Sequence, residues 1–145
     1  LVLYEKHFSL KYSIARFYNV YGPNQITDGK YSNLIGRWIN NIKKNIPCEI
    51  YGNGEKKRDF THVDDIVDAL ILIMEREAFG YEFELGRGES YSINEVAKMF
   101  NTKIKYKKEK PGEAKETICD STLAKKILNW TPKINLKEWI KNELV

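Results

Sequence analysis

Helix-like and strand-like segments alternate along this 145-residue chain, and the alternation restricts the possible folds more than any other feature. The segments whose apolar residues recur at helical spacing are 34–42, 66–74 and 93–100. The segments rich in β-branched and aromatic residues are 12–21, 48–51 and 81–85. Such alternation is typical of α/β proteins, in which helices cover a sheet that contains parallel strands. We therefore predict an α/β fold, with no flexible linker to divide it.

Polar residues mark the expected starts of the helices, and these residues are Ser32, Thr61, Ser92, Asp120 and Asn135. Ser92 and Glu95 have the spacing of a capping box, as do Thr61 and Asp64. The helix after Thr61 has a wide apolar face, so we expect it to be the best-buried helix in the chain. Residues 103–108 alternate lysine with isoleucine and tyrosine, which indicates an exposed edge strand.

The composition excludes several classes of protein. Hydrophobic residues make up 42% of the chain and charged residues 30%, which is enough apolar material for a packed core. No apolar run is long enough to span a bilayer, and no signal peptide opens the chain. The net charge of +4 is small for a protein that binds a phosphate backbone. We therefore expect a cytoplasmic protein with neither a membrane nor a nucleic-acid partner.

The cysteine and histidine residues give no pattern of metal ligands. Cys48 and Cys119 lie far apart in the sequence, and His7 and His62 are the two histidines. We predict buried free thiols and no metal site. The first residue is not Met, and residues 1–11 look like the end of a helix, so we expect the chain to be a fragment.

Asn19 is the first candidate for function, because it stands among aromatic and β-branched residues just before Gly22 and Pro23. An asparagine at a strand end often satisfies the backbone of its own turn. The carboxyl ends of strands are also where ligands bind in open α/β sheets. The residues alone leave both interpretations open.

Arg58 precedes the acidic start of a predicted helix, and its guanidinium has the shape to bind a phosphate with two hydrogen bonds. On spacing alone, a surface ion pair with Asp59 or Asp64 is favoured. The stretch 107–120 is rich in both charges, so it is either a solvated loop or a basic wall for an anionic ligand. His62 has the chemistry of a general base, but a structural role at a helix start is more common.

Several stretches together resemble one family, the NAD-dependent sugar-nucleotide epimerases and dehydratases of the extended short-chain dehydrogenase/reductase class, which include UDP-glucose 4-epimerase. Residues 16–23 resemble the R-x-x-N-V-Y-G-P motif of that family. Residues 50–54 and 58–65 resemble its Y-G-x-G and R-D-F-x-H-V-x-D motifs. Residues 110–113 resemble R-P-G-[DE], and 120–130 resemble the helix that follows it. The order agrees, and the match covers nearly the whole chain from Ser13 on.

The resemblance implies a fold in which this chain is the C-terminal half of a Rossmann-type epimerase. About 1–23 and 60–80 are then the last elements of the Rossmann layer. About 24–59 and 81–145 are then the small α/β domain that binds the nucleotide sugar.

The resemblance also implies a role for individual residues. Asn19 is expected to hydrogen-bond the diphosphate of the substrate, and Arg58 to clamp it. Asn33 and Leu34 are expected to line the nucleotide pocket, with Leu34 acting through its backbone.

The remaining implied residues meet the base and the ribose. Ile50 and Tyr51 are expected to contact the base, and Glu113 the ribose hydroxyls. Lys110 stands where the family usually has arginine, so it keeps the charge but loses the bidentate fork.

The family's catalytic residues do not occur at matching positions in this sequence. There is no Gly-x-x-Gly-x-x-Gly loop for NAD. Tyr106 and Lys110 match the Tyr-x-x-x-Lys pattern in spacing, but they lie in a predicted strand that runs into Pro111. We therefore expect no catalytic residue in this chain, and we expect NAD to be bound mainly by a preceding half.

The activity implied by the resemblance is that of an epimerase that oxidises a nucleotide-diphosphate sugar at C4 through a 4-keto intermediate. This chain alone is expected to be inactive, and the whole enzyme to be a homodimer. The alternatives are a 4,6-dehydratase of the same family and a non-catalytic module that binds nucleotide sugars.

Overall fold

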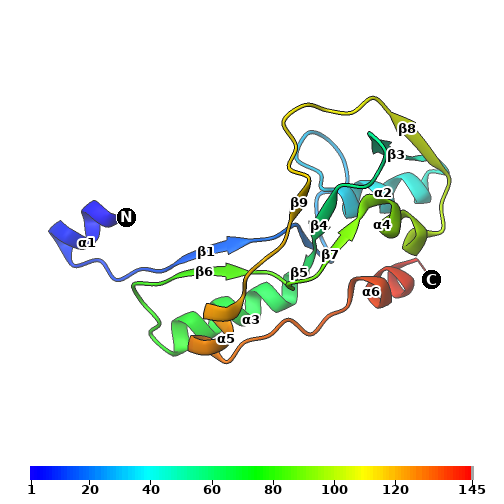
Figure 1. Cartoon of the computed structure of the whole chain (residues 1–145). Helices are drawn as coiled ribbons and strands as arrows, with labels where there is room; N and C mark the ends of the chain where they lie inside the picture. The colour runs from blue at the N-terminus through cyan, green and yellow to red at the C-terminus, as the bar shows by residue number, and fades with distance from the viewer. Residues whose placement is uncertain (145) are drawn as a thin grey trace.

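Two hydrophobic clusters organise the chain in the computed structural model, which describes residues 1–144 (Figure 1). The helices are α1 (Val2–Phe8), α2 (Leu34–Lys43), α3 (Val63–Glu75), α4 (Ile93–Phe100), α5 (Thr122–Leu128) and α6 (Leu136–Glu143). The strands are β1 (Ile14–Phe17), β2 (Val20–Tyr21), β3 (Cys48–Tyr51), β4 (Lys57–Asp59), β5 (Thr61–His62), β6 (Glu82–Leu85), β7 (Ser90–Ser92), β8 (Ile104–Lys107) and β9 (Glu116–Thr117). The predicted α/β class is confirmed.

The first cluster is built on the parallel pair β1–β6, in which Ile14 lies opposite Glu82. Helices α3 and α5 lie together on one face of this pair (Figure 1). Phe83 and Leu85 point into the cluster and are fully buried, because alternate residues of a strand face the same side. The core of this cluster therefore forms between one strand pair and two helices.

The packing of β6 and α5 differs from the predicted division, which assigned all of 81–145 to the second unit. Both elements belong to the first cluster, because β6 pairs with β1 and α5 packs on α3 and β6. The second cluster contains α2, α4, α6 and the parallel pair β3–β8. Two of its buried aromatic side chains, Trp38 and Phe100, meet edge to face with ring centroids 5.6 Å apart.

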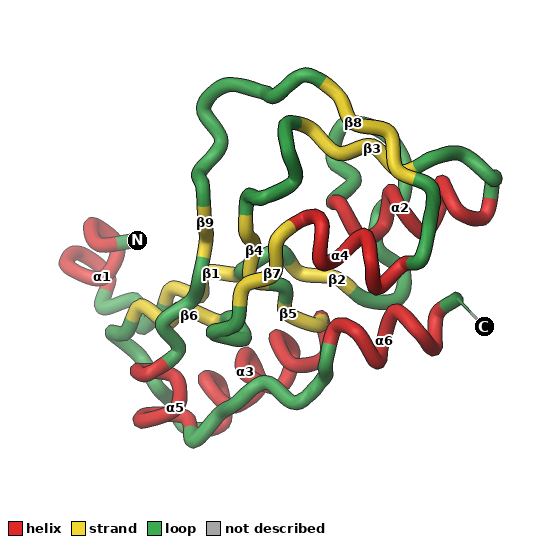
Figure 2. Tube along the Cα trace, turned by 45° about the vertical axis from the view of Figure 1, so that its right-hand side comes forward, coloured by secondary structure: helices red, strands yellow, loops and turns green. Residues whose placement is uncertain are grey.

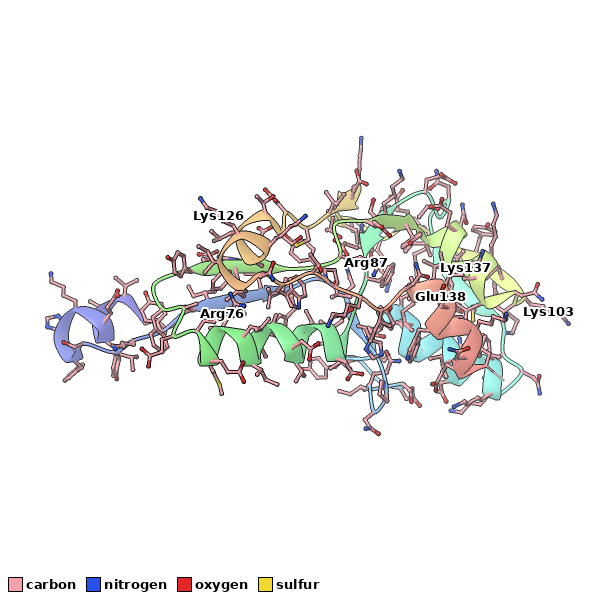
Figure 3. All side chains as sticks on the ribbon, turned by 90° about the horizontal axis from the view of Figure 1, so that it is seen from below. Arg76, Arg87, Lys103, Lys126, Lys137 and Glu138 are labelled. Carbon is pink, nitrogen blue, oxygen red and sulfur yellow. The ribbon has the colours of Figure 1, made fainter. Side chains whose placement is uncertain are left out.

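Short strands join the two clusters. The parallel pair β2–β5 and the three-stranded sheet β7–β4–β9 lie between them (Figure 2). Arg87 strengthens this region, since its Nη1 donates to the carbonyl of Ile134 at 3.0 Å. Figure 3 shows Arg87 near the middle of the molecule, beside the segment that leads from α5 to α6.

Three predicted helix caps are displaced by one residue. The N-cap of α2 is Asn33 rather than Ser32, and the N-cap of α3 is His62 rather than Thr61. The N-cap of α5 is Ser121 rather than Asp120. Thr61 belongs to β5 instead, because its backbone pairs with Val20. The predicted capping box of Ser92 and Glu95 is confirmed at α4.

Helix α3 is not the best-buried helix, so that prediction was wrong. Ile66, Ala69 and Ile73 are buried on one face, whereas Ile71 and Met74 on the other face are 43% and 71% exposed. Within residues 1–144, α3 packs against α5, β5 and β2 and shares its hydrophobic cluster with the buried residues of β6. The face that carries Ile71 and Met74 lies away from these elements. None of the helices in the described part of the chain is both long and apolar enough to cross a membrane.

Candidate nucleotide-sugar site

One pocket, whose apolar lining belongs to the second cluster, brings together all eight residues that the resemblance singled out. It has a volume of about 200 Å³. The eight are Asn19, Asn33, Leu34, Ile50, Tyr51, Arg58, Lys110 and Glu113. Five further residues line the same pocket, and they are Arg37, Glu49, Lys56, Phe60 and Ile93.

Asn19 lies where the predicted strand 12–21 breaks into β1 and β2. Its backbone is left-handed, with φ of 32°, a conformation that asparagine tolerates better than most residues. Its Nδ2 donates to the carbonyl of Asp59 at 2.6 Å, so the side chain is bound to β4 and not to its own turn. This geometry favours the interpretation in which Asn19 belongs to a site at the carboxyl end of a strand.

Asn33 fixes the wall of the pocket formed by the start of α2. Its Oδ1 accepts the N–H of Gly36 at 2.8 Å, which caps the helix. Its Nδ2 donates to the carbonyl of Val20 at 2.8 Å, which ties the helix to β2. Leu34 and Arg37 follow on the helix, and both line the pocket.

Ile50 and Tyr51 form the wall contributed by β3. Ile50 is fully buried, while the ring of Tyr51 is half-buried. The Nζ of Lys110 lies 3.9 Å from the centroid of the Tyr51 ring, within the range of a cation–π interaction. Lys110 is therefore held by an aromatic face.

Arg58 binds the loop that crosses the pocket between β8 and β9. Its Nη1 donates to the carbonyls of Lys57 at 2.7 Å and Ala114 at 2.9 Å. Its Nη2 lies 4.0 Å from Oε2 of Glu113. The surface ion pair with Asp59 or Asp64 does not form.

Asp59 has a different role from the one predicted on spacing, because its side chain is fully buried. Its Oδ1 accepts the N–H of Arg87 at 3.0 Å. Its Oδ2 accepts the N–H groups of Gly88 at 2.8 Å and Cys119 at 3.1 Å. Burial raises the pKa of this carboxyl, and the three backbone donors act against that rise. Asp59 thus fastens β4 to two loops on either side of it.

Lys56 is a pocket residue that the sequence analysis missed. Its Nζ lies 2.9 Å from Oε1 of Glu109 and 3.2 Å from Oε2 of Glu113. The hydrogen bond to Glu109 raises the pKa of this ammonium group. Lys56 could have been identified from its spacing to Arg58, because side chains two residues apart on an extended chain lie on the same side.

The charges in the pocket favour an anionic ligand. Arg37, Lys56, Arg58 and Lys110 are cations, and Glu49 and Glu113 are anions, so the lining carries a net charge of 4 − 2 = +2. A hydrogen bond from Lys107 lowers the pKa of Glu49, which keeps that carboxylate ionised. Guanidinium and ammonium groups at one site are the usual partners of phosphate oxygens.

Two further sequence candidates have structural roles. His62 is 3% exposed, and its Nδ1 accepts the N–H of Asp64 at 3.2 Å as the cap of α3. The hydroxyl of Tyr106 donates to Oδ1 of Asn94 at 3.1 Å, while Lys110 lies over Tyr51. Tyr106 and Lys110 therefore do not form a catalytic pair.

The start of α3 does not fit the pyrophosphate of a dinucleotide, and the described residues contain no group of metal ligands. The strand-to-helix junction before α3 carries Asp64 and Asp65 in its first turn, and this negative charge disfavours a phosphate there. Within residues 1–144 no group of three His, Cys, Asp or Glu side chains could hold a metal ion. Cys48 and Cys119 are buried free thiols, as predicted.

Comparison with known proteins gives a consistent result. Residues 1–92 match the model of the NAD dependent epimerase/dehydratase family. The chain is 34% identical over 146 residues to a UDP-glucuronate 4-epimerase of Thermodesulfobacterium geofontis, covering 95% of this chain and 43% of that protein. It is 30% identical over 142 residues to UDP-glucuronic acid decarboxylase 4 of Arabidopsis thaliana, covering 93% of this chain and 31% of that protein.

Solved structures agree with these sequence matches. The UDP-glucose 4-epimerase of Thermotoga maritima, solved with UDP-glucose, superposes with a TM-score of 0.90 at 31% identity, over 97% of this chain and 47% of that one. The UDP-glucuronic acid 4-epimerase of Bacillus cereus, solved with UDP-glucuronic acid and NAD, gives a TM-score of 0.86 at 28% identity, over 98% of this chain and 46% of that one. The chain thus spans less than half the length of these relatives.

Proposed function

Because this chain belongs to the NAD dependent epimerase/dehydratase family, we propose that it is the nucleotide-sugar-binding part of an NAD-dependent sugar-nucleotide epimerase. The observation that carries the proposal is the single pocket lined by all eight residues identified from the family motifs. The relatives solved with UDP-glucose and UDP-glucuronic acid support a UDP-sugar as the ligand. The reaction of the complete enzyme in this proposal is epimerisation of the sugar at C4 through a 4-keto intermediate.

The proposed ligand position follows from the chemistry of the pocket walls. Arg58 and Asn19 supply donors for the diphosphate, next to each other across β4 and the β1–β2 break. The helix start at Asn33 and Leu34 and the strand at Ile50 and Tyr51 enclose the nucleoside from two sides.

The ribose lies toward the loop between β8 and β9 in this proposal. Glu113 accepts hydrogen bonds from the ribose hydroxyls, since a carboxylate oxygen is an acceptor that two neighbouring hydroxyls can share. Lys110 stays over the ring of Tyr51 and adds positive charge beside the base.

The oxidation step relies on residues other than those described here. The cofactor of the family is NAD, and the start of α3, with Asp64 and Asp65 in its first turn, does not fit its pyrophosphate. We propose that other residues hold NAD and supply the catalytic tyrosine and lysine, and that this chain alone has no epimerase activity. The homodimer predicted from the resemblance stays a prediction, to be checked by light scattering of the complete enzyme.

A non-catalytic nucleotide-sugar-binding module is the second candidate. The observation that favours it is the separation of Tyr106 from Lys110, which leaves the one Tyr-x-x-x-Lys match in the sequence without a catalytic geometry. A 4,6-dehydratase or a decarboxylase would share the same pocket, since decarboxylases are among the relatives.

The test uses the complete reading frame that encodes this sequence, purified and assayed with UDP-glucose, UDP-glucuronic acid and UDP-N-acetylglucosamine. We expect interconversion of C4 epimers, detected by nuclear magnetic resonance, and saturable binding of UDP by calorimetry. Binding without turnover would favour the module. A folded protein that does not bind UDP would exclude both candidates.

A further inference from the structure

Two cations of the pocket converge on one carboxylate oxygen. The Nζ of Lys56 lies 3.2 Å from Oε2 of Glu113, and the Nη2 of Arg58 lies 4.0 Å from the same oxygen. Lys56 is also bound to Glu109 at 2.9 Å, and its side chain is only 15% exposed. An ammonium and a guanidinium are thus already arranged around a single anionic oxygen.

The position of that oxygen indicates what the two cations can bind. Carboxylate and phosphate oxygens take the same charge-assisted hydrogen bonds from lysine and arginine. Oε2 of Glu113 therefore stands in for a phosphate oxygen in the free pocket. Lys110, the residue at the family's arginine position, is instead 3.9 Å from the centre of the Tyr51 ring.

We propose that Lys56 is a further diphosphate-binding residue, and that Glu113 is the internal anion that Lys56 and Arg58 hold until a nucleotide enters. This inference rests on the proposed function and extends it to a residue outside the family motifs. Because Lys110 is held over the ring of Tyr51, Lys56 supplies the second cation, beside Arg58, that binds the diphosphate.

Entry of the nucleotide is then an exchange of anions. The diphosphate takes the positions near Lys56 and Arg58 that Oε2 of Glu113 occupies in the free protein. The released carboxylate of Glu113 becomes free to accept the ribose hydroxyls. The loop between β8 and β9 carries Glu109 and Glu113, so both carboxylates that Lys56 contacts in the free protein belong to one segment.

Lys57 provides a matched control because it has the same charge and is the neighbouring residue. It is exposed and lines a different surface groove, beside Ser92 and Glu95. Its backbone pairs with Glu116, as part of the β4–β9 pair. Loss of the Lys57 charge changes the net charge of the protein by the same amount as loss of the Lys56 charge. Only loss of the Lys56 charge changes the charge of the pocket.

The experiment measures calorimetric binding of UDP and of uridine to the protein from the complete reading frame, as wild type, Lys56→Gln and Lys57→Gln. We expect Lys56→Gln to weaken UDP binding about tenfold, as for loss of one charge-assisted hydrogen bond. Uridine should bind no more weakly to either variant than to wild type, because it has no diphosphate, and UDP binding should not change in Lys57→Gln. Equal UDP affinities for Lys56→Gln and wild type would overturn the inference while leaving the proposed function intact. A wild-type protein that does not bind UDP would overturn both.

A second measurement does not depend on the folding of the Lys56 variant. Inorganic pyrophosphate has no ribose, so Glu113 acts on it only as a competing anion. We expect Glu113→Gln to bind pyrophosphate several-fold more tightly than wild type, since the internal anion is gone. Unchanged or weaker pyrophosphate binding in Glu113→Gln would contradict the exchange.

Discussion

Replacement of Asp59 by alanine tests whether one buried carboxylate holds the pocket together. The carboxylate accepts three backbone N–H groups, from Arg87, Gly88 and Cys119. A buried donor left without an acceptor costs about 1–3 kcal/mol. Three such donors cost at least about 3 kcal/mol in total. The variant no longer has to bury a charged carboxylate, which offsets any cost above that minimum. We expect Asp59→Ala to lower the free energy of unfolding by about 3 kcal/mol.

The isosteric variant Asp59→Asn separates the hydrogen bonds from the volume of the side chain. Its remaining oxygen can keep the two donors that meet Oδ2, from Gly88 and Cys119, and its amide nitrogen faces the N–H of Arg87. We therefore expect a smaller loss, about 1–2 kcal/mol, from one unsatisfied donor.

Urea unfolding followed by tryptophan fluorescence is a suitable assay, because the chain contains three tryptophans and two of them are buried in different clusters. Asp68→Ala is the control, since Asp68 is exposed and its one ion-pair contact, with Lys133, is at 4.0 Å; its effect should stay within about 0.5 kcal/mol. If Asp59→Ala costs no more than Asp68→Ala, the three hydrogen bonds do not hold the pocket together. If Asp59→Asn lowers the free energy of unfolding as much as Asp59→Ala does, neither the volume of the side chain nor the number of its hydrogen bonds determines the loss of stability.

Three further predictions concern single elements around the site. Asn33→Ala removes the cap of α2 and its bond to β2, so the free energy of unfolding should fall by about 1–2 kcal/mol, measured in urea, whereas Asn33→Ser should recover part of that loss. The pKa of Glu95 is lowered by the backbone N–H of its capping box, so its contribution is present above the usual carboxyl pKa of 4.5 and is lost as the pH falls through its lower folded value. Thermal unfolding from pH 7 to pH 3 should therefore show a steeper acid loss in wild type than in Glu95→Gln, and parallel curves would refute this. Gly54→Ala places a Cβ 2.1 Å from Oδ1 of Asn94 on a backbone with φ of +78°, so the melting temperature of this variant should fall. Gly112 is the control, because it has φ of +79° and no atom near the position of a Cβ. Gly112→Ala should therefore show the effect of backbone strain alone, and a smaller fall in melting temperature.

The longer elements of the fold could be predicted because each is long enough to show a period. Helix α2 has ten residues and α3 has thirteen, so their apolar stripes are clear in the sequence. Strands β2, β5 and β9 have two residues each, which is too short for any alternation to appear. Their positions depend on partners forty or more residues away, such as the pairing of Val20 with Thr61. Sequence patterns contain no information on such pairings.

The displaced cap of α3 shows a second limit of sequence reasoning. Thr61 and Asp64 have the spacing of a capping box, yet the cap is His62, whose Nδ1 accepts the N–H of Asp64. Thr61 is held in β5 by its parallel partner Val20, so its backbone cannot also start the helix. A tertiary contact here overrides a local preference that was correctly recognised.

The pocket charges show why the family motifs predicted part of the site and not all of it. The motifs identify residues by their agreement with a pattern, so they include Lys110, which has the right position, and omit Lys56, which belongs to no motif. In the structure, Lys56 and not Lys110 is the lysine that contacts an anionic oxygen. Lys110 lies against an aromatic ring, while Lys56 and Arg58 share an oxygen of Glu113. Whether a lysine can bind a phosphate depends on where its Nζ is held, and that position is set by the loop between β8 and β9. Because that loop is long and carries both charges in alternation, its partners are decided by tertiary packing, and they become visible only when β4 and the loop are placed side by side.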